Sequence, residues 1–139
     1  MSLMQLMTKE VTSLPTTAPV LDAAKFMTDM NVGSVVVVDD GKPVGILTDR
    51  DITTKVVVKE RDPHTVKVKD IMASPVVTIS VEKDVIDATK LMCNNKVRRF
   101  PVVDSGGKLV GLLSLDDILI FLGQEMEDIA ICLKSEIGK

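Results

Sequence analysis

Apolar positions in the first third of the chain have a helical period. They recur at three- and four-residue steps after Pro19, which predicts a helix with one buried face, and Asn31-Val32-Gly33 is the expected stop. The apolar positions of this helix are Val20, Ala23, Ala24, Met27 and Met30.

The pattern then changes to that of β-strands. Ser34 to Asp39 is an unbroken β-branched run, typical of a strand buried on both faces. Asp40-Gly41 favours a hairpin turn, and Pro43 to Leu47 is the returning strand. With a short strand at Val11 to Leu14 and a helix from Arg50 to about Lys59, the predicted order is strand, helix, strand, strand, helix.

This order is present twice, and the second copy predicts a strand at Val76 to Ile79, a helix at Val85 to Asn95, strands at Phe100 to Val103 and Leu109 to Leu113, and a final helix. Residues 6–39 match residues 71–104 at an offset of 65, and residues 41–53 match residues 107–119 at an offset of 66. Identical pairs fall on apolar, glycine and aspartate positions together, so shared hydrophobicity alone does not explain them. They include Met7/Met72, Asp22/Asp87, Met27/Met92, Val32/Val97, Gly45/Gly111 and Asp51/Asp117.

One such module has too little core to be stable alone, and two copies bury more surface by packing together. We therefore predict an α/β (α+β) fold of two β-α-β-β-α repeats packed sheet to sheet with pseudo-twofold symmetry, plus a C-terminal helix. The expected divisions are residues 4–59 for the first repeat, 60–69 for a linker, 70–123 for the second repeat and 124–139 for an amphipathic helix.

Composition narrows the class of protein. The net charge is −3 and the chain has no Trp or Tyr, which argues against nucleic-acid binding. No apolar run approaches the ~20 residues of a membrane span and no signal-peptide pattern opens the chain, so we expect a cytoplasmic protein without membrane contact. Cys93 and Cys132 lack metal-type spacing and are expected to be reduced thiols.

Each repeat carries a strand that ends in a hydroxyl residue followed three positions later by an acid. The first copy has Thr48 and Asp51, and the second has Ser114 and Asp117. One interpretation is a helix cap, because a hydroxyl caps the coming helix and the helix dipole favours a carboxylate in its first turn. The other interpretation is a ligand contact, and the duplication favours a closer look at the surroundings.

The second repeat reads Val97-Arg98-Arg99-Phe100-Pro101-Val102-Val103-Asp104 and then Gly-Lys-Leu-Val-Gly-Leu-Leu-Ser with an acid three residues later. This set resembles the CBS domain, named after cystathionine β-synthase, and the resemblance covers residues 4–123. It implies a tandem pair, or Bateman module, that binds adenosine-containing ligands (AMP, ADP, ATP or S-adenosylmethionine) in clefts between the repeats. It also implies a homodimer that regulates a protein partner and requires no cofactor.

The resemblance assigns a role to each matching residue. Asp51 and Asp117 would accept hydrogen bonds from ribose hydroxyls, and Thr48 and Ser114 would contact the ribose or phosphate. Arg98 and Arg99 would face the phosphates, because a planar guanidinium matches phosphate geometry. The residues expected beside the adenine are Ile46, Leu112, Ile71 and Met72.

The first repeat departs from this pattern, with Gly33 and Ser34 where the second has the two arginines. We therefore expect one well-equipped phosphate site and one weaker or empty site. Taken alone, Arg98 and Arg99 slightly favour a solvated pair before a strand, whereas beside Asp51 and Asp117 they favour the phosphate role.

Beyond the repeats, apolar residues recur along one helical face from Ile118 to Ile137. Gly123 is expected either to kink this helix or to divide it. Such a stripe would be a liability on a monomer, so we expect it to pack on a second subunit or back on the module.

Catalysis needs a nucleophile with a base, a metal set or paired carboxylates in a cleft. The sole histidine, His64, lies in the linker and is expected to be exposed, so we predict that the protein is not an enzyme. A regulatory module that binds an adenosine ligand is the first hypothesis. The alternative is a structural dimerisation module that binds no nucleotide.

Overall fold

The computed structural model describes residues 2–137. Its elements are α1 (Leu3–Leu6), β1 (Ser13–Pro15), α2 (Val20–Met30), β2 (Ser34–Asp39), β3 (Lys42–Thr48), α3 (Asp49–Ile52), the π-helix η1 (Thr53–Val57), α4 (Val68–Ile71), β4 (Ile79–Ser80), α5 (Val85–Asn95), β5 (Arg99–Val103), β6 (Leu109–Ser114) and α6 (Leu115–Ile137).

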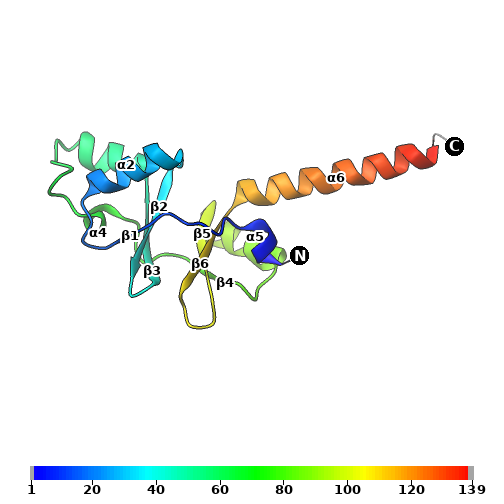
Figure 1. Ribbon diagram of the computed structural model, residues 1–139, viewed down its shortest axis with the longest axis horizontal. Helices are drawn as coiled ribbons and strands as arrows, with labels where there is room; N and C mark the ends of the chain where they lie inside the picture. The colour runs from blue at the N-terminus through cyan, green and yellow to red at the C-terminus, as the bar shows by residue number, and fades with distance from the viewer. Residues whose placement is uncertain (1, 138–139) are drawn as a thin grey trace.

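The strands form two three-stranded sheets of the same topology. In the first, β1 pairs parallel with β2 and β2 pairs antiparallel with β3; β4, β5 and β6 repeat the arrangement. The two sheets lie side by side in the middle of the body, with α2 and α5 on opposite sides (Figure 1). The predicted α/β (α+β) fold of two packed repeats is confirmed.

The first hairpin has the predicted turn. Asp40 and Gly41 both have positive φ, 51° and 75°. A two-residue turn of this kind matches the twist of the strands it joins, and aspartate followed by glycine adopts it at low cost.

Two hydrophobic cores form, and each combines side chains of one repeat with side chains of the segment that leads into the other repeat. The first core joins Val20, Val35 and Leu47 to α4 through Val68 and Ile71. The second core joins Phe100 and Leu113 to the N-terminal segment, which contributes Leu3 and Met7. The segment leading into each repeat therefore packs in the core of the other repeat.

The helix that closes the first repeat is not uniform. It is α-helical only over α3 and continues as η1. The hydroxyls of Thr53 and Thr54 donate to the carbonyls of Asp49 and Arg50 at 3.1 and 2.8 Å. Threonine hydroxyls that bond to the i−4 carbonyl bend helices slightly, but Thr28 in α2 and Thr89 in α5 make the same bond within regular α-helix.

The last helix, α6, is continuous from Leu115 to Ile137, and Gly123 does not interrupt it. Ile118 is its one buried residue, and most of α6 extends away from the body (Figure 1). Residues 138 and 139 of the expected C-terminal helix lie outside the described residues. Within residues 2–137, no helix combines the length and the apolar character needed to cross a bilayer.

Candidate ligand-binding cleft

The two hydroxyl–acid motifs adopt the same local structure. The Thr48 N–H donates to Asp51 Oδ2 at 2.9 Å, and the Asp51 N–H donates to the Thr48 hydroxyl oxygen at 3.2 Å. In the second repeat the Ser114 N–H donates to Asp117 Oδ2 at 2.9 Å and the Asp117 N–H donates to the Ser114 hydroxyl oxygen at 3.1 Å. Both acids thus close capping boxes, and the capping interpretation of these motifs holds.

The segment leading into each repeat crosses to the strand before the other repeat's motif. Thr8 exchanges two backbone hydrogen bonds with Leu112, each 2.9 Å long. Ile46 and Ala73 exchange the equivalent pair, at 3.2 and 2.9 Å. Each hydroxyl–acid motif begins where one of these paired strands ends. The crossing therefore creates two junctions: the first lead-in lies beside the second motif, and the second lead-in lies beside the first motif.

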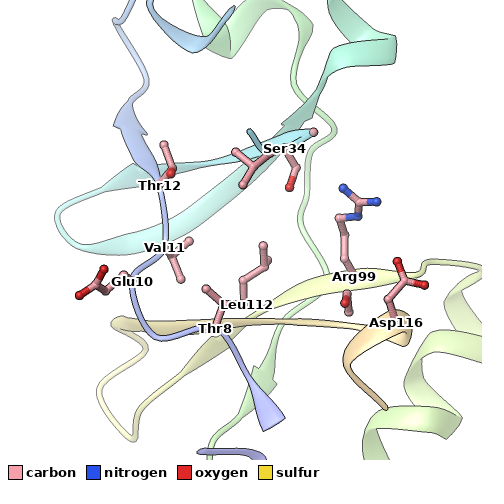
Figure 2. Close-up of a pocket in the computed structure, with 11 residues that line it drawn as sticks. Thr8, Glu10, Val11, Thr12, Ser34, Arg99, Leu112 and Asp116 are labelled. Atoms are coloured by element: carbon pink, nitrogen blue, oxygen red, sulfur yellow. The ribbon is translucent and has the colours of Figure 1, made fainter. Parts of the chain in front are cut away.

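A cleft of about 230 Å³ opens at the junction of the first lead-in with the second repeat. Figure 2 shows the lead-in along the left side of the cleft, the start of β2 with Ser34 above the cleft, and the β5–β6 hairpin below it. The cleft is lined by Thr8, Glu10, Val11, Thr12, Val32, Gly33, Ser34, Arg99, Leu112, Ser114 and Asp116.

The lining combines apolar, hydroxyl, cationic and acidic side chains. Val11, Val32 and Leu112 offer an apolar surface, and four hydroxyls from threonine and serine residues offer donors and acceptors. Arg99 is the cation, and it points into the space between the repeats (Figure 2). Glu10 and Asp116 are acids at the same cleft. Such a lining suits a ligand with a flat apolar part, hydroxyl groups and an anionic group.

Three residues expected from the sequence line this cleft: Arg99, Leu112 and Ser114. Asp117 stands next to it, bonded to Ser114, while the preceding acid, Asp116, lines it. Arg98 is exposed, and its Nη2 lies 3.8 Å from Asp116 Oδ1. An exposed pair of this length contributes little to stability.

The remaining expected residues lie at the other junction. Ile46 pairs with Ala73, Thr48 caps α3, and Asp51 is bonded to Thr48. Met72 is half-buried against the first core. Ile71 is only 3% exposed and packs inside that core.

Gly33 and Ser34 line the same cleft as Arg99. The first repeat has no arginine at these two positions, but Arg99 of the second repeat supplies a cation to the same cleft. That one phosphate site is well equipped and the other weaker or empty stays a prediction.

Most of the lining from the first repeat was not expected, above all Thr8, Thr12 and Ser34. One signal in the sequence pointed to it: Met7 matches Met72 at the repeat offset. The lead-in role given to Ile71 and Met72 therefore applies equally to residues 6–12.

His64 is exposed in the linker, as predicted, and its Nδ1 lies 3.0 Å from Asp62 Oδ1. The His64 backbone N–H also donates to this carboxylate and lowers the pKa of Asp62 below its usual value. Within residues 2–137, no three acidic, histidine or cysteine side chains gather as a metal site would require. The linker histidine thus has a local structural partner.

The sequence model of the CBS domain matches residues 3–58 and again residues 68–124. The chain belongs to the CBS domain family. The resemblance found in the sequence is confirmed, and the chain is a tandem CBS pair.

An uncharacterized protein of Methanopyrus kandleri is 42% identical over 110 residues, covering 78% of this chain and 56% of that protein. The CBS pair thus spans little more than half the length of that relative. A conserved CBS domain protein of Thermoplasma acidophilum has the same fold, with a TM-score of 0.77 and 28% identity over 87% of this chain and 68% of that one.

The CBS pair of protein MJ0100 has been solved in complex with 5′-methylthioadenosine and S-adenosyl-L-methionine. Its TM-score is 0.77 over 88% of this chain and 99% of that one. At 24% identity, this likeness concerns the fold.

Proposed function

We propose that this CBS pair binds an adenosine-containing ligand in the cleft between its repeats and acts as a non-enzymatic regulatory module. The observation that carries the proposal is the meeting of apolar side chains, hydroxyls and Arg99 from both repeats in one cleft. A nucleotide offers the complementary set: a flat base, a ribose diol and an anionic phosphate. The ligands of the MJ0100 pair support it only in that the same fold admits an adenosine group in that protein.

Each part of the cleft has a role in this proposal. Leu112 and Val11 pack against the adenine, and Ser114 with Asp117 receives the ribose hydroxyls, since a carboxylate accepts from two neighbouring hydroxyls. Arg99 holds the phosphate through its planar fork. Arg98 lies near the proposed phosphate end of the cleft, because it is paired with Asp116, which lines the cleft.

The size of the cleft favours a compact ligand. Its volume of about 230 Å³ lies just below the range of roughly 300–1,000 Å³ typical of small-molecule sites. A nucleoside monophosphate suits this space better than a dinucleotide, so we place AMP before NAD.

Calorimetric titration with AMP, ADP, ATP and S-adenosylmethionine tests the proposal. We expect Arg99→Ala to raise the Kd for AMP about tenfold to hundredfold, because a charge-assisted hydrogen bond is worth roughly 1.5–3 kcal/mol. Adenosine, which lacks the phosphate, should bind the wild type and Arg99→Ala equally.

Arg61→Ala is the matched control, since Arg61 is an exposed arginine in the linker. The role of Arg99 is refuted if both alanine variants bind AMP as the wild type does. The proposed function as a whole is refuted if no compound of the panel produces heat or thermal stabilisation.

A second candidate function, a homodimerisation or protein-interaction module, is favoured by α6. Its outer part exposes a stripe of large apolar side chains: Leu122, Met126, Ile129, Leu133 and Ile137. A contiguous apolar face of this kind marks a contact surface. The two functions are compatible if α6 binds the regulated partner or a second copy.

We also propose a cytoplasmic location. Cys93 and Cys132 are both exposed and neither forms a disulfide within residues 2–137. Exposed free thiols persist in reducing compartments. Labelling of both thiols in protein taken directly from cells under non-reducing conditions is the expected result.

A further inference from the structure

The two motif acids, Asp51 and Asp117, stand at equivalent positions but have different surroundings. Asp51 Oδ2 accepts from the Thr48 N–H at 2.9 Å and from the Thr48 hydroxyl at 3.1 Å. Its other oxygen, Oδ1, lies 3.2 Å from Lys55 Nζ. Both oxygens of this carboxylate are therefore engaged by the protein itself.

Asp117 is engaged on one side only. Its Oδ2 accepts from the Ser114 N–H at 2.9 Å, and no donor within residues 2–137 contacts its Oδ1. This oxygen is free to accept from a ligand hydroxyl. The capping function and a ligand contact are thus compatible at Asp117, since each uses a different oxygen.

Lys55 is fixed from two directions. Besides Asp51, its Nζ donates to the backbone carbonyl of Ile71 at 3.0 Å. Ile71 ends α4, two residues before the lead-in residue Ala73 that pairs with Ile46. The ammonium group therefore bridges the first motif to the lead-in of the second repeat, across the junction that corresponds to the Arg99 cleft.

The two repeats differ at the position of Lys55. Lys55 lies in η1, the π-helical stretch, and it meets Asp51 from four residues along. In the second repeat, the equivalent stretch is regular α-helix. At the repeat offset of 66, the counterpart of Lys55 is Phe121, which carries no charge.

We propose that Lys55 occupies the ligand-facing oxygen of Asp51 and closes the first-motif junction, so that each chain binds one adenosine ligand, at Asp117. A ribose diol that entered the Asp51 junction would have to break both the ion pair and the bond to Ile71. At Asp117 nothing has to be displaced. This inference rests on the proposed function and adds the number of sites and the residue that sets it.

The experiment counts bound ligand per chain. Native mass spectrometry and calorimetry are carried out on the full chain with AMP, ATP and S-adenosylmethionine, and the tightest binder is the probe. The wild type should bind one ligand per chain, and Lys55→Met, which removes the ammonium and keeps the length of the side chain, should bind two. Lys59→Met is the matched control, since Lys59 is an exposed lysine just after η1, and it should bind one.

The reciprocal variant places an ammonium at the proposed site. Phe121→Lys should weaken binding of the probe tenfold or more, because its ammonium can take the free Asp117 oxygen. Phe121 is half-exposed and belongs to neither core, so this variant is expected to fold, which circular dichroism checks.

The outcomes separate the two proposals. Two ligands per wild-type chain would overturn the role of Lys55 and leave the proposed function intact. One ligand in both the wild type and Lys55→Met would also overturn it, as would loss of affinity in Lys55→Met, which would make Lys55 a ligand contact. No binding of any probe to the wild type refutes the proposed function, and this inference with it.

Discussion

At the scale of single residues, each duplicated glycine leaves space for the duplicated methionine of the opposite lead-in. A Cβ placed on Gly111 would lie 2.3 Å from Met7 Sδ, and one on Gly45 would lie 2.3 Å from Met72 Sδ. Real atoms do not approach so closely, so each glycine is required by the methionine of the opposite lead-in. The pairs Met7/Met72 and Gly45/Gly111 are thus two halves of one contact made twice.

This contact gives the first prediction. Gly111→Ala should destabilise the protein by about 1–3 kcal/mol through overpacking, measured by urea unfolding. In a Met7→Ala background the same substitution should cost less than half as much, because the neighbours of the new methyl group are all Met7 side-chain atoms.

Gly123→Ala is the control for the glycine substitution. Nothing lies within 4 Å of a Cβ at Gly123, in the middle of α6. Alanine in an exposed helix interior should stabilise by up to about 1 kcal/mol. Equal costs of Gly111→Ala in the two backgrounds would contradict the proposed packing.

At the scale of elements, the periodic helices were predictable and the irregular ones were not. The helix predicted at Val85–Asn95 has those ends in the structure, because Asp84 caps it and a strong apolar period fills it. The helix predicted from Arg50 to Lys59 contains the π-helix η1 instead. The apolar period does not show whether a five-residue stretch is α-helical or π-helical.

The first strand of each repeat begins later than predicted. The apolar residues from Val11 and from Val76 suggested strands, yet β1 begins at Ser13 and β4 at Ile79. The preceding residues are used by the lead-in, which crosses to the other repeat through Thr8 and Ala73. A partner distant in sequence decides this boundary, so a local pattern could not predict it.

The second prediction concerns α6. Replacing both Met126 and Ile129 by glutamate should convert a self-associated wild type into a monomer, measured by light scattering on a sizing column. Their side chains are 71% and 59% exposed, so the thermal midpoint of the body should not fall. Self-association should be lost because two carboxylates on an apolar contact surface are costly to desolvate.

Glu127→Gln, on the polar side of α6, is the control and should leave the assembly unchanged. A wild type that is monomeric at high concentration would remove the homodimer from the second candidate function. The remaining role for α6 would then be contact with a different protein.

At the scale of the whole molecule, the crossed lead-ins make one body from two repeats. Leu3 is fully buried in the second core although it stands 76 positions before Ile79, the next residue of that core outside the lead-in. The C-terminal end of the linker is held against the first repeat as well, since the Val20 N–H donates to the Val66 carbonyl and the Val68 N–H to the Ala18 carbonyl, both at 2.8 Å. Neither repeat holds a complete core of its own.

The third prediction follows from this arrangement. Leu3→Ala should lower the free energy of unfolding by about 2–5 kcal/mol, as expected for a fully buried leucine, and unfolding should remain a single transition. The measurement is urea unfolding followed by circular dichroism.

Met4→Ala serves as the neighbouring control, because Met4 is 49% exposed and should change stability by less than about 0.5 kcal/mol. Two separate transitions in the wild type would show that the repeats unfold independently. That outcome would contradict the shared cores.

The same crossing limits what the sequence could reveal about the cleft. Motif positions in the second repeat pointed to Arg99, Leu112 and Ser114, which do line it. Thr8, Thr12 and Ser34 reach it only because the first lead-in leaves its own repeat. Ile71, expected beside the adenine, packs in the first core, and its contact with a ligand stays a prediction.

One consequence concerns the root of α6. Ser114, which caps α6, and Asp117, in its first turn, are the residues proposed to receive a ribose. The whole helix has 23 residues and is about 34 Å long, and Ile118 near its base is its one buried residue. A tilt of about 10° at this root carries the tip through roughly 6 Å. A rearrangement at the proposed ligand site that is too small to disturb either core would therefore become a displacement the size of a side chain at Ile137.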